Sequence, residues 1–160
     1  MSATEALATE VLARARALGL SIATAESCTG GLVSGALTDI PGSSDVVDRG
    51  FVTYSNAAKR EMLGVAAATL EAQGAVSEAV ARAMAAGALA HSAAGLAIAI
   101  TGIAGPGGSE FKPEGRVCFA TARTGAEPLS ETVEFGPLGR SAVRAASVMH
   151  ALLLLRRALG

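Results

Sequence analysis

The hydrophobic positions of the first thirty-eight residues alternate between helical spacing and one short apolar run. Apolar residues recur at helical spacing over residues 4–18, which predicts a helix that ends at Gly19. Residues 20–25 form a short apolar run, and helical spacing resumes at Leu32. Between them stands the serine loop, Ser-Cys-Thr-Gly-Gly over residues 27–31. This pattern predicts a strand, a tight turn and a helix.

The middle of the chain predicts a second strand and two helices. Residues 46–54 suit a strand or one arm of a bent hairpin. Ser55 or Asn56 can cap a short helix after it, and Ser77 is a suitable N-cap for a helix that reaches about residue 93.

The last third contains three apolar runs and a long helical pattern. Strands are predicted over residues 95–101, 116–123 and 129–135, and a helix over residues 139–159. The glycine-rich loop, residues 101–109, follows the first of these strands. Interleaved helices and strands predict an α/β fold with three layers, α/β/α, around a mixed sheet.

Composition restricts the class of protein. With 51% hydrophobic and 17% charged residues, the chain is not disordered, and residues 1–160 suffice for a single domain. It contains 19 glycines and only 3% aromatic residues, so helices and strands should pack closely. Small residues on the helix faces would also tolerate close subunit packing, and we expect a homo-oligomer.

Charge, cysteine spacing and the length of the apolar runs restrict which partners and metal sites are expected. The formal net charge is -1 and no basic cluster exceeds Arg156–Arg157, so no nucleic-acid partner is expected. Cys28 and Cys118 are far apart, without the spacing of a metal site or a disulfide framework. The acidic start and the short apolar runs predict no membrane partner. We therefore expect a cytoplasmic protein that needs no metal.

The serine loop is the first candidate for chemistry. Ser27 follows a predicted strand and precedes Gly30 and Gly31, whose amides can approach a ligand closely, so it is the candidate nucleophile. It is not a GxSxG elbow, because Ala25 and Thr29 stand at the glycine positions. The open alternative is that the serine or the threonine only caps the next helix.

A nucleophilic serine needs a base. His91 and His150 lie within predicted helices and are interpreted as structural, and arginine stays protonated. The chain has two lysines, and Lys59 follows Tyr54 by five residues at a predicted strand end. A desolvated lysine can accept the serine proton, directly or through the phenol. Alternatively, the tyrosine is a half-buried aromatic and the lysine a solvated surface charge.

The glycine-rich loop and two arginines are candidates for anion binding. The loop offers backbone amides to a phosphate or an oxyanion, although it could also be an unspecific turn. It is no P-loop, because Gly108-Ser109 stands where lysine would be required. Arg140 and Arg144 begin the last predicted helix, where the dipole disfavours cations. A ligand phosphate or Glu134 could offset that cost.

Several blocks of the sequence resemble the CinA C-terminal family of competence/damage-inducible proteins. The matching blocks are residues 26–31, 53–59, 63–65, 74–77, 101–108 and 112–113, with Arg140 and Arg144. Stand-alone members of that family hydrolyse nicotinamide mononucleotide to nicotinate mononucleotide and ammonia, without a metal or cofactor. The resemblance implies Ser27 as nucleophile and Lys59 and Tyr54 as its activating partners.

The resemblance and the loop chemistry together give a set of expected substrate contacts. They are Thr29, Gly30, Gly31, Thr101, Gly102, Gly105, Gly107, Arg140 and Arg144. Glu114 stands where the family usually has valine, and the stretch from Ser109 to Phe111 is slightly short. Two alternatives stay open: an amidase for another substrate, and a non-catalytic nucleotide-binding or regulatory module.

Overall fold

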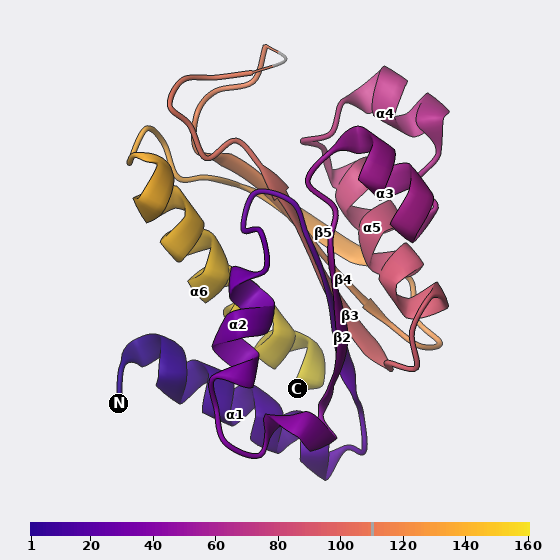
Figure 1. Ribbon diagram of the computed structural model, residues 1–160, viewed down its shortest axis with the longest axis vertical. Coiled ribbons are helices and arrows are strands. Elements are labelled where there is room, and N and C mark those ends of the chain that lie inside the picture. Colours follow the sequence, from indigo (N-terminus) through magenta and orange to yellow (C-terminus); the bar gives the residue numbers. More distant parts are fainter. Residues whose placement is uncertain (110) are drawn as a thin grey trace.

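A five-stranded sheet separates two sets of helices in the computed structural model (Figure 1), which describes residues 1–109 and 111–160. In chain order the elements are α1 (Ala3–Ala17), β1 (Ile22–Glu26), α2 (Leu32–Thr38), the 3-10 helix η1 (Ser43–Asp45), β2 (Val47–Val52), α3 (Asn56–Leu63), α4 (Ala67–Gln73), α5 (Glu78–Ala90), β3 (Leu96–Gly102), β4 (Arg116–Arg123), β5 (Leu129–Glu134) and α6 (Arg140–Leu159).

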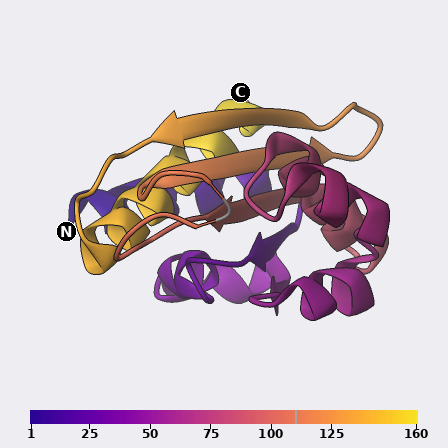
Figure 2. The ribbon, with the colours of Figure 1, turned by 90° about the horizontal axis from the view of Figure 1, so that it is seen from above.

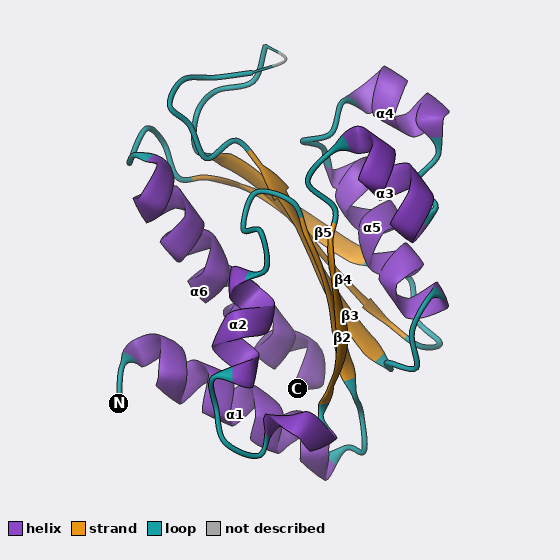
Figure 3. Cartoon of the chain, viewed as in Figure 1, coloured by secondary structure: helices purple, strands orange, loops and turns teal. Residues whose placement is uncertain are grey.

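The sheet is mixed, with the order β2-β1-β3-β4-β5. Strand β1 runs parallel to β2 and β3, whereas β4 is antiparallel to β3 and to β5. Figure 3 shows the sheet nearly edge-on, with helices on both sides. Helices α1, α2 and α6 cover one face, and α3, α4 and α5 cover the other (Figures 1 and 2). The predicted three-layer α/β architecture is confirmed. Strand β2 is not a hairpin arm, because it pairs in parallel with β1.

The two faces of the central strand β3 carry side chains of different size. Leu96, Ile98 and Ile100 belong to the core beneath α1, α2 and α6, and Ala97 and Ala99 to the core beneath α5. Helix α5 therefore lies against small side chains, as the composition predicted.

Helix α3 approaches α5 especially closely. A Cβ atom at Gly87 of α5 would lie 2.1 Å from the Leu63 carbonyl oxygen, so only glycine permits this contact. The contact fixes the helix that carries Lys59.

Helix α4 was not predicted from the sequence; it has seven residues and no side-chain cap at Ala66. Helix α5 ends at Ala90 rather than near residue 93, because His91 is the C-cap of this helix. The Nδ1 of His91 lies 2.8 Å from the Gly87 carbonyl oxygen.

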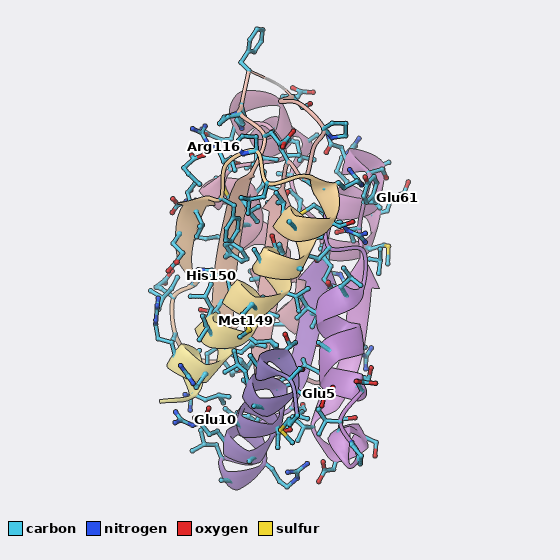
Figure 4. All side chains as sticks on the ribbon, turned by 90° about the vertical axis from the view of Figure 1, so that its left-hand side faces the viewer. Glu5, Glu10, Glu61, Arg116, Met149 and His150 are labelled. Carbon is cyan, nitrogen blue, oxygen red and sulfur yellow. The ribbon has the colours of Figure 1, made fainter. Side chains whose placement is uncertain are left out.

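His150 lies on α6 (Figure 4), 2.7 Å from a carboxylate oxygen of Glu131. Both histidines have such local partners, away from the cavity described below.

The parallel strands decide where chemistry can occur. Their carboxyl ends meet at one edge of the sheet, where ligands of open α/β folds usually bind. At this edge the Ser27 amide donates to the Ile100 carbonyl at 2.9 Å, and the Thr53 amide to the Glu26 carbonyl at 2.9 Å. Over the described ranges, no helix is long and apolar enough to cross a membrane.

Candidate active site

A cavity of about 340 Å³ opens at the carboxyl ends of β1, β2 and β3. Its walls comprise Ser27, Cys28, Tyr54, Asn56, Lys59, Ala75, Val76, residues 101–109 and Arg140. Arg140 in this lining keeps its positive charge, so the cavity suits an anionic ligand.

Lys59 and Ser27 form a direct pair at the base of the cavity. The Lys59 Nζ lies 2.9 Å from the Ser27 Oγ, and it also donates to the carbonyls of Thr53 at 2.9 Å and Tyr54 at 3.2 Å. Lys59 is only 1% exposed, so the interpretation of a solvated surface charge is wrong. An amine accepts a hydroxyl proton in its neutral form, through the lone pair on nitrogen. The pair therefore has the geometry of a nucleophile and its base.

The lysine is held at the first turn of α3. The Ser55 side chain accepts a hydrogen bond from the Ala58 amide at 3.0 Å, which confirms the predicted cap. Asn56, the first residue of this helix, also lines the cavity and was not among the predicted contacts. Its position beside a predicted cap was the signal available in the sequence.

Glu26, which was not among the predicted site residues, holds the serine loop in place through hydrogen bonds. Its carboxylate is 1% exposed and accepts hydrogen bonds from the Thr29 hydroxyl at 2.6 Å, the Val33 amide at 2.9 Å and the Ser34 amide at 3.0 Å. An acid near a helix N-terminus is favoured by the helix dipole, and this was the available signal. The helix-cap interpretation of Ser27 or Thr29 is wrong, because the carboxylate takes these amides.

Arg144 supports the same loop. Its guanidinium donates to the Cys28 carbonyl at 3.0 Å and to the Thr29 carbonyl at 3.5 Å. Thr29, Gly30, Gly31 and Arg144 were expected to contact the substrate, but the structure does not bring them into the cavity lining. Their bonds instead give the loop its shape.

Tyr54 occupies the outer part of the cavity. Its side chain is 61% exposed, rather than half-buried, and its hydroxyl accepts a hydrogen bond from Arg140 at 2.9 Å. Because Lys59 reaches Ser27 directly, the phenol does not lie between them. The tyrosine contacts the lysine through its carbonyl oxygen.

The glycine-rich loop forms the opposite wall and is tied to the rest of the molecule by cations. Arg140 donates to the Gly105 carbonyl at 2.8 Å. Just after the loop, Lys112 donates to the carbonyls of Gln73 at 2.7 Å and Val76 at 2.5 Å. Glu134, the expected local partner of the arginines on α6, instead pairs with Arg116 at 2.6 Å.

Three predicted contacts in this wall differ in what they can offer a ligand. Thr101 and Gly102 line the cavity, but the threonine hydroxyl already donates to the Ala75 carbonyl at 2.9 Å. The Gly107 amide donates to a carboxylate oxygen of Glu114, so this amide is bonded within the loop.

Cys28 is the other side chain in the lining that could act as a nucleophile. Burial raises the pKa of its thiol to about 11, so the thiol stays protonated near neutral pH. Ser27, with a lysine beside its oxygen, is the better candidate. In the ranges the structure describes, no group of three or more His, Cys, Asp or Glu side chains could hold a metal ion.

The comparisons with known proteins agree on one family. The family described as the CinA C-terminal domain matches residues 4–159. A CinA-like protein of Mycolicibacterium paratuberculosis is 57% identical over 145 residues, which are 88% of this chain and 33% of that protein. A CinA-like protein of Mycobacterium marinum is 55% identical over 139 residues, 86% of this chain and 32% of the relative. The chain spans about a third of the length of these relatives.

Two solved structures share the fold over nearly all of both chains. The competence/damage inducible protein CihA of Agrobacterium tumefaciens has a TM-score of 0.94 and 52% identity, covering 99% of this chain and 96% of that one. The competence or damage-inducible protein of Enterobacter asburiae has a TM-score of 0.95 and 35% identity, covering 100% of both chains.

Proposed function

Because the chain belongs to the CinA C-terminal domain family, we propose that it is a metal-independent amidase for nicotinamide mononucleotide. The reaction would hydrolyse the carboxamide to give nicotinate mononucleotide and ammonia. The observation that carries this proposal is the buried contact of 2.9 Å between the Lys59 Nζ and the Ser27 Oγ. Two free, buried cysteines fit a cytoplasmic location.

The Ser27–Lys59 pair would supply the nucleophile and the base of an acyl-transfer reaction. Ser27 Oγ attacks the amide carbon while its proton moves to Lys59 Nζ. The tetrahedral intermediate then breaks its C–N bond, and the lysine returns the proton to the leaving nitrogen, which departs as ammonia. Water attacks the resulting ester, with the lysine again taking a proton, and the serine leaves with its proton restored. Backbone amides of the glycine-rich loop are suited to stabilise the oxyanion.

Recognition of the nucleotide would fall to the outer part of the cavity. Arg140 is exposed there and already donates to two neutral oxygens, the Gly105 carbonyl and the Tyr54 hydroxyl. A phosphate would offer this guanidinium stronger, charge-assisted hydrogen bonds. The amide group would then lie deeper, toward Ser27.

Mass spectrometry of nicotinamide mononucleotide incubated with the protein tests the proposal. The readout is replacement of the amide NH2 by OH, with chelator present, for the wild type and Ser27→Ala. Nicotinamide and its riboside, run in parallel, would reveal whether the phosphate is required. We expect conversion of the nucleotide by the wild type only.

The other outcomes are equally informative. Conversion by both proteins would remove Ser27 from the mechanism. Conversion by neither would favour another substrate or a non-catalytic nucleotide-binding module, a role that the competence and damage names of the relatives leave open. Binding of the nucleotide that survives Ser27→Ala without wild-type turnover would support the module.

A further inference from the structure

A carboxylate touches the glycine-rich loop at the point where its backbone could bind an anion. The Gly107 amide donates to the Oε1 of Glu114, a residue on the return segment after the loop. The same carboxyl group lies against Gly105, because a Cβ atom built there would be 2.6 Å from the Glu114 Cδ. Both glycines line the cavity, whereas Glu114 is outside the lining. The carboxylate therefore lies directly behind the cavity wall.

The bonded amide belongs to the kind of backbone that binds anions. Glycine-rich loops present successive N–H groups, and such groups commonly bind phosphate. Gly105 and Gly107 both have positive φ values, 93° and 77°, which glycine alone adopts readily. In this chain, however, the Gly107 N–H is bonded to an internal anion. It is therefore not offered to an anion in the cavity.

Gly105 is in contact with both a cation and an anion. Arg140 reaches the Gly105 carbonyl at 2.8 Å, and Glu114 packs against the Cα of the same residue. The arginine attracts an anionic group bound at this wall. The glutamate repels it and also holds the amide that the group would use.

We propose that Glu114 is a specificity-determining residue that lowers the affinity of this site for the phosphate group of its substrate. The choice of a phosphorylated substrate rests on the proposed function. An uncharged ligand does not experience this repulsion. Glu114 thus reduces the advantage that a phosphate gives a nucleotide over its nucleoside.

Calorimetric titration with ribose 5-phosphate tests the proposal without requiring turnover. The proteins are the wild type, Glu114→Ala, Glu114→Gln and a control, Glu134→Gln, whose carboxylate pairs with Arg116 outside the cavity. We expect Glu114→Ala to tighten binding by at least about threefold, because it removes the charge and frees the amide. Glu114→Gln removes only the charge and should lie between Glu114→Ala and the wild type. The control should match the wild type.

Unchanged or weaker binding by both Glu114 variants, at an unchanged melting temperature, would overturn the proposal. It would mean that the carboxylate only clamps the loop. Failure of all four proteins to bind ribose 5-phosphate would also overturn it. If Glu114→Ala unfolds, Glu114→Gln decides the outcome.

The two proposals fail in distinguishable ways. Tighter phosphate binding by the variants without any amide hydrolysis by the wild type would contradict the proposed amidase and leave the role of Glu114 intact. Hydrolysis by the wild type with the same phosphate affinity in every variant would contradict the role of Glu114 alone.

Discussion

The two loops that line the cavity are held by different kinds of interaction. The serine loop is fixed by buried or partly buried, charge-assisted bonds: three are accepted by the Glu26 carboxylate, and two are donated by Arg144. The glycine-rich loop is tied by partly or fully exposed side chains, Arg140, Lys112 and Glu114.

This difference separates chemistry from recognition. A nucleophile must keep its position within a fraction of an ångström, and buried bonds to a charged group supply that rigidity. A binding wall must exchange its own bonds for those of a ligand, and exposed bonds cost little to exchange. Substitutions on the serine side should therefore lower kcat, and substitutions on the glycine-rich side should change KM.

Replacement of the buried lysine should have the largest effect. We expect Lys59→Met to lower kcat about a thousandfold, because the serine loses its base, while the fold persists. The matched control is Lys112→Met, the other lysine of the chain, which should keep most of the turnover rate. Steady-state kinetics and melting temperatures measure both. A Lys59→Met enzyme within tenfold of the wild type would mean that another group takes the proton.

Neutralising the buried carboxylate should have the next largest effect. Glu26→Gln places an NH2 group against helix amides that need an acceptor, so we expect a loss of about 1–3 kcal/mol in stability. The displaced serine should lower kcat about tenfold and leave KM nearly unchanged. Denaturant unfolding and the kcat against KM split report the two effects. Glu61→Gln, at an exposed site on α3 (Figure 4), is the control.

A Glu26→Gln enzyme that is less stable but keeps its full kcat would show that the carboxylate stabilises the helix only. The expected asymmetry between the two loops would then not hold for catalysis.

Loss of the exposed arginine should act mainly on binding. We expect Arg140→Ala to raise KM for the nucleotide about tenfold and to change kcat less than threefold, because it removes charge-assisted bonds to the phosphate. The control is Arg157→Ala, an arginine paired with Glu131 outside the cavity. An unchanged affinity for the nucleotide would make the assignment of Arg140 wrong.

Much of the fold and the centre of the site could be predicted from the sequence. Ser27 and Lys59 were predicted as nucleophile and base from their residue types and their positions at predicted strand ends. Thr101 was predicted as a contact from the glycine-rich loop and the family resemblance, and all three line one cavity. These signals are local in the chain, or follow from the topology that the local signals imply.

The contacts behind the cavity walls could not be predicted. Arg144 bonds to Cys28, a residue 116 positions earlier in the chain, and Arg140 reaches a tyrosine hydroxyl 86 positions away. Side chains this long can reach many partners, and only the packed structure selects one. The same holds for Glu26. Its carboxylate accepts a hydrogen bond from an amide of α2, and this contact depends on where α2 packs in the folded protein.

The smallest effect is expected at Cys28, which tests whether the neighbouring serine is the nucleophile. Its pKa is raised from 9.0 to about 11 by burial, so at pH 8 the thiolate fraction is about a hundredfold lower in the folded than in the unfolded protein. Iodoacetamide labelling, followed by peptide mapping, should therefore be slow in the native state and rise with pH toward 11.

Cys28→Ala keeps the carbonyl that Arg144 contacts and should lower kcat less than about threefold. Rapid labelling of Cys28 at neutral pH with matching loss of activity would contradict this expectation. The reactive atom would then be a thiolate, and the buried Lys59 would stabilise its charge instead of accepting a proton from Ser27. In that case the rigid serine loop would position Cys28, and Cys28 rather than Ser27 would be the nucleophile.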